Sequence, residues 1–267
     1  PSRTRFYPPH PSPAMPFPRR LPALFLSSLV LAPTIGALPV QAAPPTANQL
    51  QALEAALNSR DDSALSTLLS KGPGLNPDEL KQRRQYLRDN FADVRWEVKK
   101  GPNLRNGEPS VTMKVSGTRE QGGSIFRLES EQRLSLQTDG QRFTGQTIWR
   151  EQSLLRSGEN SPSVSLQIPD AVLTGQRYDL DVIFDEPLDG ALVAGGIRPI
   201  SDEEVKAMDS PRLDLTALGG AGGLFKVVQA PQTPGSQTWA VLLVHPKGVV
   251  SATKRVRVVS DRQVLEP

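Results

Sequence analysis

The residues best suited to move a proton lie in the first half of the chain. Tyr86 is the only tyrosine of residues 44–157, and Asp93 follows it seven positions later. A phenol can stabilise an oxyanion while a carboxylate removes a proton, as in isomerases and cyclases. Tyr86, however, falls in a helical pattern of arginines and leucines, and Asp93 falls at a helix-to-strand junction that favours a turn residue. We therefore predict no catalytic residues and keep Tyr86 and Asp93 as weak candidates.

A second pair of acids, Glu129 and Glu131, shares one face of a predicted strand. Alternate residues of a strand lie about 7 Å apart, a separation that some hydrolases use between two carboxylates. Arg127 and Arg133 flank the pair on the same face and would keep both glutamates ionised, whereas a general acid needs a raised pKa. A solvated, salt-bridged face is the favoured interpretation.

Metal and nucleophile chemistry has little support in the sequence. The chain has no cysteine, which excludes thiolate ligands and cysteine nucleophiles. The acids Asp179, Asp181, Asp185 and Glu186 lack the glycine-containing spacing of a calcium loop. His245 has no accompanying Gly-x-Ser-x-Gly motif, and its segment His245-Pro-Lys-Gly248 is typical of a hairpin turn. We expect no metal and no cofactor.

The charge of the chain is concentrated at its start. The net charge is +3, but residues 1–43 contain four arginines and no acid, which leaves 27 basic against 28 acidic residues in the remainder. A nucleic-acid-binding surface needs a concentrated stripe of lysine and arginine. We therefore expect no nucleic-acid partner.

The first 43 residues have the order of a secretory leader. Residues 1–14 are rich in proline and arginine and predict a disordered or untranslated extension. From Met15, two arginines precede an apolar run and then small residues at Ala42 and Ala43, where a signal peptidase would cut. A retained membrane anchor and an organelle transit peptide are the alternatives. We expect a signal peptide over residues 15–43 and export to a periplasm or thylakoid lumen, with membrane attachment only through an uncleaved leader.

Residues 46–157 predict a first domain. Leucines at helical spacing indicate three helices, the last carrying Tyr86, Leu87 and Phe91 toward a core, with Arg83, Arg84 and Arg88 facing water. Alternation then predicts four antiparallel strands, beginning at Val94 and ending near Ile148.

This order, with Asp61-Asp62-Ser-Ala-Leu65 in the helical part and Gly145-Gln-Thr-Ile-Trp149-Arg-Glu at the end of the sheet, resembles the nuclear transport factor two-like (SnoaL-like, cystatin-like) domain. The resemblance implies a cone in which a bent sheet wraps helices around a pocket. Its members include ketosteroid isomerases, cyclases and many noncatalytic proteins. On this basis we expect a pocket lined by Tyr86, Trp96, Met113, Phe126, Leu128 and Trp149.

Residues 158–267 predict a second, all-β domain. Strand patterns recur between turns at 164–168, 178–184, 191–197, 224–228, 239–244 and 249–259, and residues 201–208 indicate a short helical turn. The segment that begins Ile168-Pro-Asp-Ala and the segment Trp239-Ala-Val-Leu-Leu-Val-His-Pro-Lys-Gly are similar to exported cyanobacterial proteins of this two-domain type, whose role is uncharacterised.

The expected fold class is therefore α+β, with an N-terminal cone of three helices on a curved antiparallel sheet followed by an all-β sandwich domain. The expected function is that of an exported, noncatalytic binding or scaffold protein with an apolar pocket or a protein-interaction surface. Its partner would be an apolar small molecule or an unidentified protein, and a homodimer through the outer sheet face is an open alternative. The other function considered is a ketosteroid-isomerase-like or cyclase-like enzyme that uses Tyr86 and Asp93.

Overall fold

Antiparallel strands make up most of the regular structure. The structure is a computed structural model, and it describes residues 43–158, 160–208, 210–220 and 222–265. Within these ranges lie four α-helices and one short 3-10 helix: α1 (Ala47–Asn58), α2 (Ser63–Leu68), α3 (Pro77–Asn90), α4 (Asp202–Ala207) and η1 (Arg262–Val264). The strands are β1 (Ala92–Lys100), β2 (Val111–Gln121), β3 (Ser124–Thr138), β4 (Phe143–Ser157), β5 (Val164–Gln167), β6 (Ala171–Leu173), β7 (Arg177–Phe184), β8 (Val193–Ile200), β9 (Thr216–Leu218), β10 (Gly223–Gln229), β11 (Gly235–His245) and β12 (Gly248–Val259).

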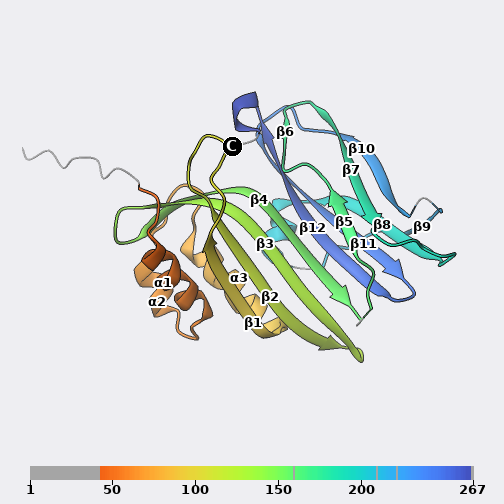
Figure 1. The fold of residues 1–267 in the computed structure, drawn as a ribbon, viewed down its shortest axis with the longest axis horizontal. Coiled ribbons are helices and arrows are strands. Elements are labelled where there is room, and N and C mark those ends of the chain that lie inside the picture. The colour runs from red at the N-terminus through yellow and green to blue at the C-terminus, as the bar shows by residue number, and fades with distance from the viewer. Residues whose placement is uncertain (1–42, 159, 209, 221, 266–267) are drawn as a thin grey trace, which may run out of the picture. The chain divides into compact units, whose positions relative to one another are not determined.

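Nine of these strands form one sheet (Figure 1). Its order is β1-β2-β3-β4-β12-β11-β8-β9, and β6 pairs in parallel with β12. The strands β10, β7 and β5 form a second sheet. The junction between the early and late strands is the β4–β12 pair, in which six residues of each strand are in register, from Glu151 opposite Arg255 to Arg156 opposite Val250.

This sheet overturns the expected fold class. Of the described residues, 50% lie in strands and 19% in helices, and the few helices are short, so they do not build an N-terminal helical cone. Periodicity located the helices and most strands correctly, but β4 runs on to Ser157 instead of ending near Ile148. The added length lets β4 pair with β12, so the sheet continues where a cone would close. The resemblance to nuclear transport factor two-like domains is wrong for the same reason.

Two apolar cores lie on this framework. One is formed by α1, α2 and the strands β1 to β4, with Leu57, Leu65 and Leu134 fully buried. The other lies between the two sheets, where Leu180 and Val182 of β7 face Val241 of β11 and Val256 of β12. In this second core the indole N–H of Trp239 donates to the Tyr178 hydroxyl (3.0 Å), which donates to Gln237 (2.8 Å), so the buried polar atoms are paired.

The helix arginines differ from expectation. Arg84, predicted to face water, has only 2% of its surface exposed. Its guanidinium donates to the carbonyl oxygens of Ala56 (2.8 Å) and Ser59 (3.2 Å) and forms an ion pair with Asp62. The last carbonyl groups of a helix have no partner within the helix. Arg84 of α3 therefore donates to carbonyl groups at the end of α1 that would otherwise lack a hydrogen bond.

The outer edge of β1 is closed by side chains of α1. The Asn58 amide accepts from the Trp96 N–H (2.9 Å) and donates to the Trp96 carbonyl (2.8 Å), which imitates a paired strand. The Glu54 carboxylate accepts from the Val98 N–H (2.7 Å). An edge strand with free backbone groups is a template for pairing with other chains, and these contacts remove part of that template.

Replacing Asn58 by leucine should open this edge. Two partly buried backbone groups of Trp96 would lose their partners, so we expect the free energy of unfolding in urea to fall by about 2–4 kcal/mol. Light scattering should also show self-association that grows with protein concentration. Asn48→Leu, at an exposed position of the same helix, is the control and should leave both measurements nearly unchanged. Equal effects of the two variants would contradict the role given to Asn58.

The predicted extension over residues 1–14 lies outside the described residues, as does the predicted signal peptide except for its last residue, Ala43. Within the described ranges, no helix has the length and apolar character needed to cross a membrane.

Candidate functional site

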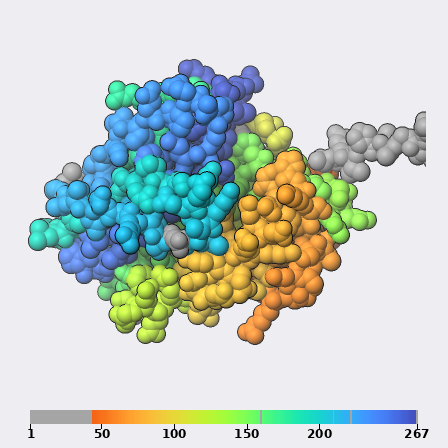
Figure 2. Space-filling view, turned by 180° about the vertical axis from the view of Figure 1, so that it is seen from behind, coloured from red at the N-terminus to blue at the C-terminus, as the bar shows by residue number. Residues whose placement is uncertain are grey.

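A cavity of about 290 Å³ lies between α3, α4 and one face of the large sheet. Seen from behind, the α4 segment lies beside α3 over this face (Figure 2). The walls come from these two helices and the residues after α4, and the floor comes from β1, β2, β3, β4, β8, β11 and β12. The helix-side lining is mostly apolar: Leu80, Tyr86, Leu87, Val205, Met208 and Pro211, with Arg83 and Glu204 as its charged members.

The floor consists of two neighbouring rows of side chains that cross the paired strands. Residues opposite each other in an antiparallel pair share a face, so the register fixes these rows. The first row runs through Trp96, Val115, Ser130, Ser153 and Thr253. The second row runs through Met113, Gln132, Glu151, Arg255, Thr238 and Ile200. Both rows cross the β4–β12 junction, so the cavity exists only because the early and late strands pair.

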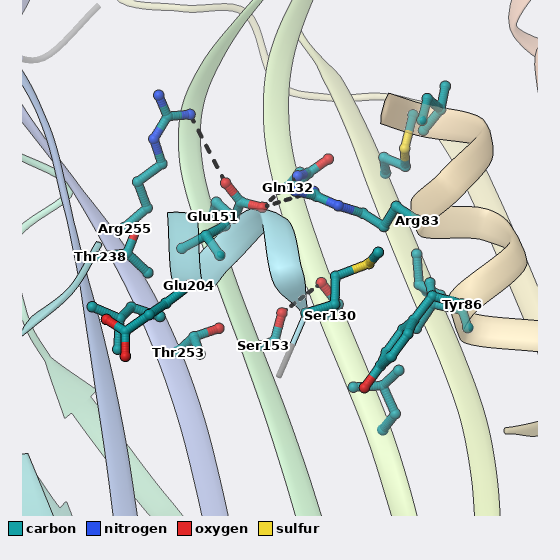
Figure 3. A pocket seen from close by; sticks show the side chains of 18 of the residues that line it. Arg83, Tyr86, Ser130, Gln132, Glu151, Ser153, Glu204, Thr238, Thr253 and Arg255 are labelled. Carbon is teal, nitrogen blue, oxygen red and sulfur yellow. Dashed lines mark hydrogen bonds and ion pairs between the residues drawn. The ribbon is translucent and has the colours of Figure 1, made fainter. Parts of the chain in front are cut away.

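Small hydroxyl side chains at the centre of the first row leave room for the cavity. The Ser153 hydroxyl lies 2.8 Å from the Ser130 hydroxyl (Figure 3). Ser130 also reaches the Gln152 carbonyl oxygen at 3.4 Å. Thr253 lies beside Ser153 on β12. These three hydroxyl-bearing residues make the centre of the first row polar.

Glu151 is the charged centre of the second row. Its carboxylate accepts from Gln132 (2.7 Å), forms an ion pair with Arg83 of α3 (3.4 Å) and lies 3.9 Å from Arg255 of β12 (Figure 3). Only 22% of its side chain is exposed. One carboxylate thus connects α3, β3 and β12, and it balances the two arginines that would otherwise repel each other at the cavity wall.

Trp96 forms an apolar end of the cavity and carries an unused donor. The residue is 3% exposed, and its indole N–H has no hydrogen-bond partner among the described residues. Asn58 fixes the Trp96 backbone from the other side, so the ring is held in place. Most buried polar groups of native proteins are paired, so this indole N–H is an exception among the described residues.

The α4 wall is held by an ion pair and a helix cap. Arg198 donates to both carboxylate oxygens of Glu204 (2.6 and 3.2 Å), and Glu204 also accepts from the Ser201 N–H (2.9 Å). The Arg198 hydrogen bond, followed by the Ser201 N–H, lowers the pKa of Glu204 from 4.5 to about 2. Met208 ends the helix with φ of 55°, in the left-handed region.

The structure brings together four of the six predicted pocket residues. Tyr86, Trp96, Met113 and Leu128 line the cavity, and Figure 3 shows Tyr86 extending from α3 over the strands. Their role as ligand contacts stays a prediction. Phe126 lies outside the cavity, where the Arg119 guanidinium stacks between it and Phe91.

Trp149 also lies outside this cavity, because a β-bulge interrupts the alternation of β4. Arg133 pairs with Arg150 while the next residue of β3, Leu134, pairs with Ile148, so Trp149 is the extra residue. Its indole N–H donates to Ser135 (2.8 Å), and the Arg257 guanidinium covers its ring at 4.8 Å. Trp149 therefore lines a separate cleft, described below.

The predicted acid–base pair is not assembled. Asp93 is exposed, has φ of 56° and lies at an irregularity of β1, where its carboxylate accepts from the Thr118 hydroxyl (3.4 Å). It does not line the cavity that contains Tyr86.

The remaining candidates take structural positions. Glu129 pairs with Arg156 (2.6 Å) and Glu131 with Lys114 (3.4 Å) on the other face of the sheet. His245 opens the turn between β11 and β12, where its Nδ1 accepts from the Lys247 N–H (3.0 Å). Among the described residues, no group of three or more histidine, aspartate or glutamate side chains could hold a metal ion.

Comparison with known proteins adds one finding. Residues 159–259 match the family model DUF8623, a domain of unknown function. The match covers the strands from β5 to β12, which supply the β8, β11 and β12 parts of the cavity and its α4 wall. No curated protein matches the chain.

Glu151→Gln should loosen the attachment of α3 to the sheet. The amide keeps the size of the side chain but leaves Arg83 and Arg255 without their counter-charge, so we expect the free energy of unfolding in urea to fall by about 1–2 kcal/mol. Glu131→Gln, which removes an exposed ion pair on the opposite face, should cost less than about 0.5 kcal/mol. Equal losses would show that Glu151 has no special role in the cavity wall.

The Glu204 ion pair should give α4 a defined dependence on pH. Because its folded pKa of about 2 lies below the ordinary 4.5, the contact stabilises the fold above about pH 4.5 and is lost as the pH falls through 2. In an NMR titration of the Glu204 carboxyl carbon, Arg198→Met should move the midpoint up toward 4.5, stopping short because Ser201 still donates. An unchanged midpoint in the variant would remove Arg198 as the cause.

Proposed function

We propose that this protein is an exported, noncatalytic binding protein and that the cavity beneath α3 and α4 holds a small, largely apolar molecule. The observation that carries the proposal is an apolar cavity with a polar floor, lying between two helices and one face of the sheet. Binding sites for small molecules are generally concave and apolar, with a few polar groups that orient the ligand.

The size and lining define the class of ligand. A volume of about 290 Å³ lies near the lower end of the range of roughly 300–1,000 Å³ usual for small-molecule sites. The apolar walls suit a compact hydrocarbon or aromatic body, and the hydroxyls of Ser130, Ser153 and Thr253 suit one or two hydroxyl or carbonyl groups on it.

The binding role is favoured over the enzymatic one by the position of the acids. An isomerase or cyclase needs a base near Tyr86, and Asp93 lies outside the cavity. Of the two carboxylates that do line it, Glu204 is held by Arg198 and Glu151 already faces two guanidinium groups. Paired in this way, it serves better as part of the wall than as a proton acceptor for a ligand.

Export is proposed from the sequence alone. The order of arginines, apolar run and small residues from Met15 to Ala43 is that of a signal peptide. A binding protein beyond the cytoplasmic membrane would meet its ligand there.

A cavity-filling variant tests the proposed function. Ser153→Phe places a ring in the centre of the floor, so we expect at least a tenfold loss of affinity for N-phenyl-1-naphthylamine, an uncharged fluorescent probe. Ser116→Phe adds the same ring to an exposed position of β2 on the other face and should bind the probe like the wild type.

The native ligand is sought in parallel. Mass spectrometry of the wild-type protein purified from its own cells under native conditions should detect an apolar molecule that Ser153→Phe lacks. The proposal fails if the probe binds the wild type and Ser153→Phe equally well, or if the wild type binds neither the probe nor a cellular apolar molecule.

A further inference from the structure

A second concave site lies on the other side of β3 and β4. It is a cleft of about 820 Å³ around Trp149, bounded by the loop after β1, by the segment before β6 and by the end of β12. Among the described residues, its charged lining consists of the arginines Arg105, Arg133, Arg150 and Arg257 and the acids Glu131 and Asp170. The cleft shares no lining residue with the apolar cavity.

The two acids of the cleft are already neutralised by lysines. The Asp170 carboxylate accepts from Lys254, whose side chain is 2% exposed, and Glu131 pairs with Lys114 (3.4 Å). Burial lowers the pKa of Lys254, and the contact with Asp170 opposes that shift. The Asp170 carboxylate therefore stabilises the charged form of Lys254. Little negative charge is left over for the arginines.

Arg133 and Arg257 are held mainly by neutral acceptors. Arg133 donates to the Ser110 hydroxyl and to the carbonyls of Pro102 and Asn103 (3.1–3.2 Å). Arg257 donates to the carbonyls of Trp149, Val264 and Leu265 (all 3.2 Å). In the part of the chain that the structure describes, neither guanidinium has a carboxylate within ion-pair distance. Arg150 has only Asp170, at 3.8 Å.

A like-charge pair lies directly beside the β-bulge. Arg133 and Arg150 are direct cross-strand partners, and like charges in that arrangement destabilise a sheet. Their side chains diverge, since Arg133 reaches the loop after β1 and Arg150 reaches toward Asp170, and the cleft takes in both. An anion between them would remove the repulsion and accept the N–H groups that remain, because a guanidinium presents five donors in a planar fork.

We propose that this cleft binds an oxyanion, a phosphate or carboxylate group, between Arg133 and Arg150 beside the Trp149–Arg257 stack. Planar guanidinium groups match both kinds of oxyanion by paired hydrogen bonds. The proposal is independent of the apolar cavity, so either site can fail without the other.

Calorimetry with two probes tests the proposal and separates the sources of the anion. Pyrophosphate and citrate are titrated into the wild-type protein, with sodium chloride at matched ionic strength as the blank. Saturable binding of pyrophosphate assigns phosphates, and saturable binding of citrate assigns carboxylates. Heat no greater than that of the salt blank for both probes overturns the proposal.

The variant Arg150→Gln then locates the site. We expect it to weaken binding of the probe at least tenfold, because half of the anion clamp is lost. Without the anion, the same variant should keep or raise the midpoint of urea unfolding, since one member of a repelling pair is removed. Arg142→Gln removes the same charge from an exposed turn and should bind the probe like the wild type.

Equal losses of affinity in both variants would mean non-specific attraction and overturn the site. If Arg150→Gln does not fold, Arg150→Lys keeps the charge but not the planar fork. It should then still bind more weakly than the wild type, and undiminished affinity would overturn the site.

Discussion

The pairing of β4 with β12 is the constraint on which the rest of the structure depends. It joins strands that are about a hundred residues apart in the chain, and six residues of each strand are held in register. It places Glu151 beside Arg255 and Ser153 beside Thr253, so the cavity floor is shared between the early and late parts of the sequence. Side-chain alternation has a period of two, and β3 fixes the faces of β4, so a slip of one residue here would turn Thr253 and Arg255 to the other face. The position of this one ladder therefore decides the composition of both sides of the sheet.

Local patterns in the sequence predict the elements well, and long-range pairing poorly. Leucine spacing locates α1, α2 and α3, and alternation locates β7, β11 and β12, because these signals arise within one helix or one strand. The residue pattern of a strand does not show which other strand it pairs with. The predicted β4, which ends near Ile148, would leave an independent four-stranded sheet. The observed β4 continues to Ser157, and β12 pairs with this added length. The fold class was missed at this step, although few elements were misplaced.

The residues of the candidate site also fall into those that local patterns predict and those that depend on long-range pairing. Tyr86, Trp96, Met113 and Leu128 could be found because alternation and helical spacing already point them inward. Glu151, Arg255 and Thr238 could not be found, because they are polar residues whose place at the cavity comes from the β4–β12 and β12–β11 registers. Trp149 was misplaced by the bulge, which inserts one residue and reverses the faces beyond it. Arg84 was misplaced because a helical pattern cannot show that a neighbouring helix end needs donors.

The bulge at Trp149 also explains how one strand serves two sites with different chemistry. On the junction side of the bulge, Glu151 and Ser153 face the apolar cavity, where Glu151 balances Arg83 and Arg255. At the bulge itself, Trp149 and Arg150 face the opposite cleft with Arg133, and the acid nearest to Arg150, Asp170 at 3.8 Å, is already paired with Lys254. In a regular strand Trp149 would share the face of Glu151, next to the guanidinium groups of the cavity wall. The extra residue moves the Trp149 ring to the face of the cleft, where the Arg257 guanidinium covers it.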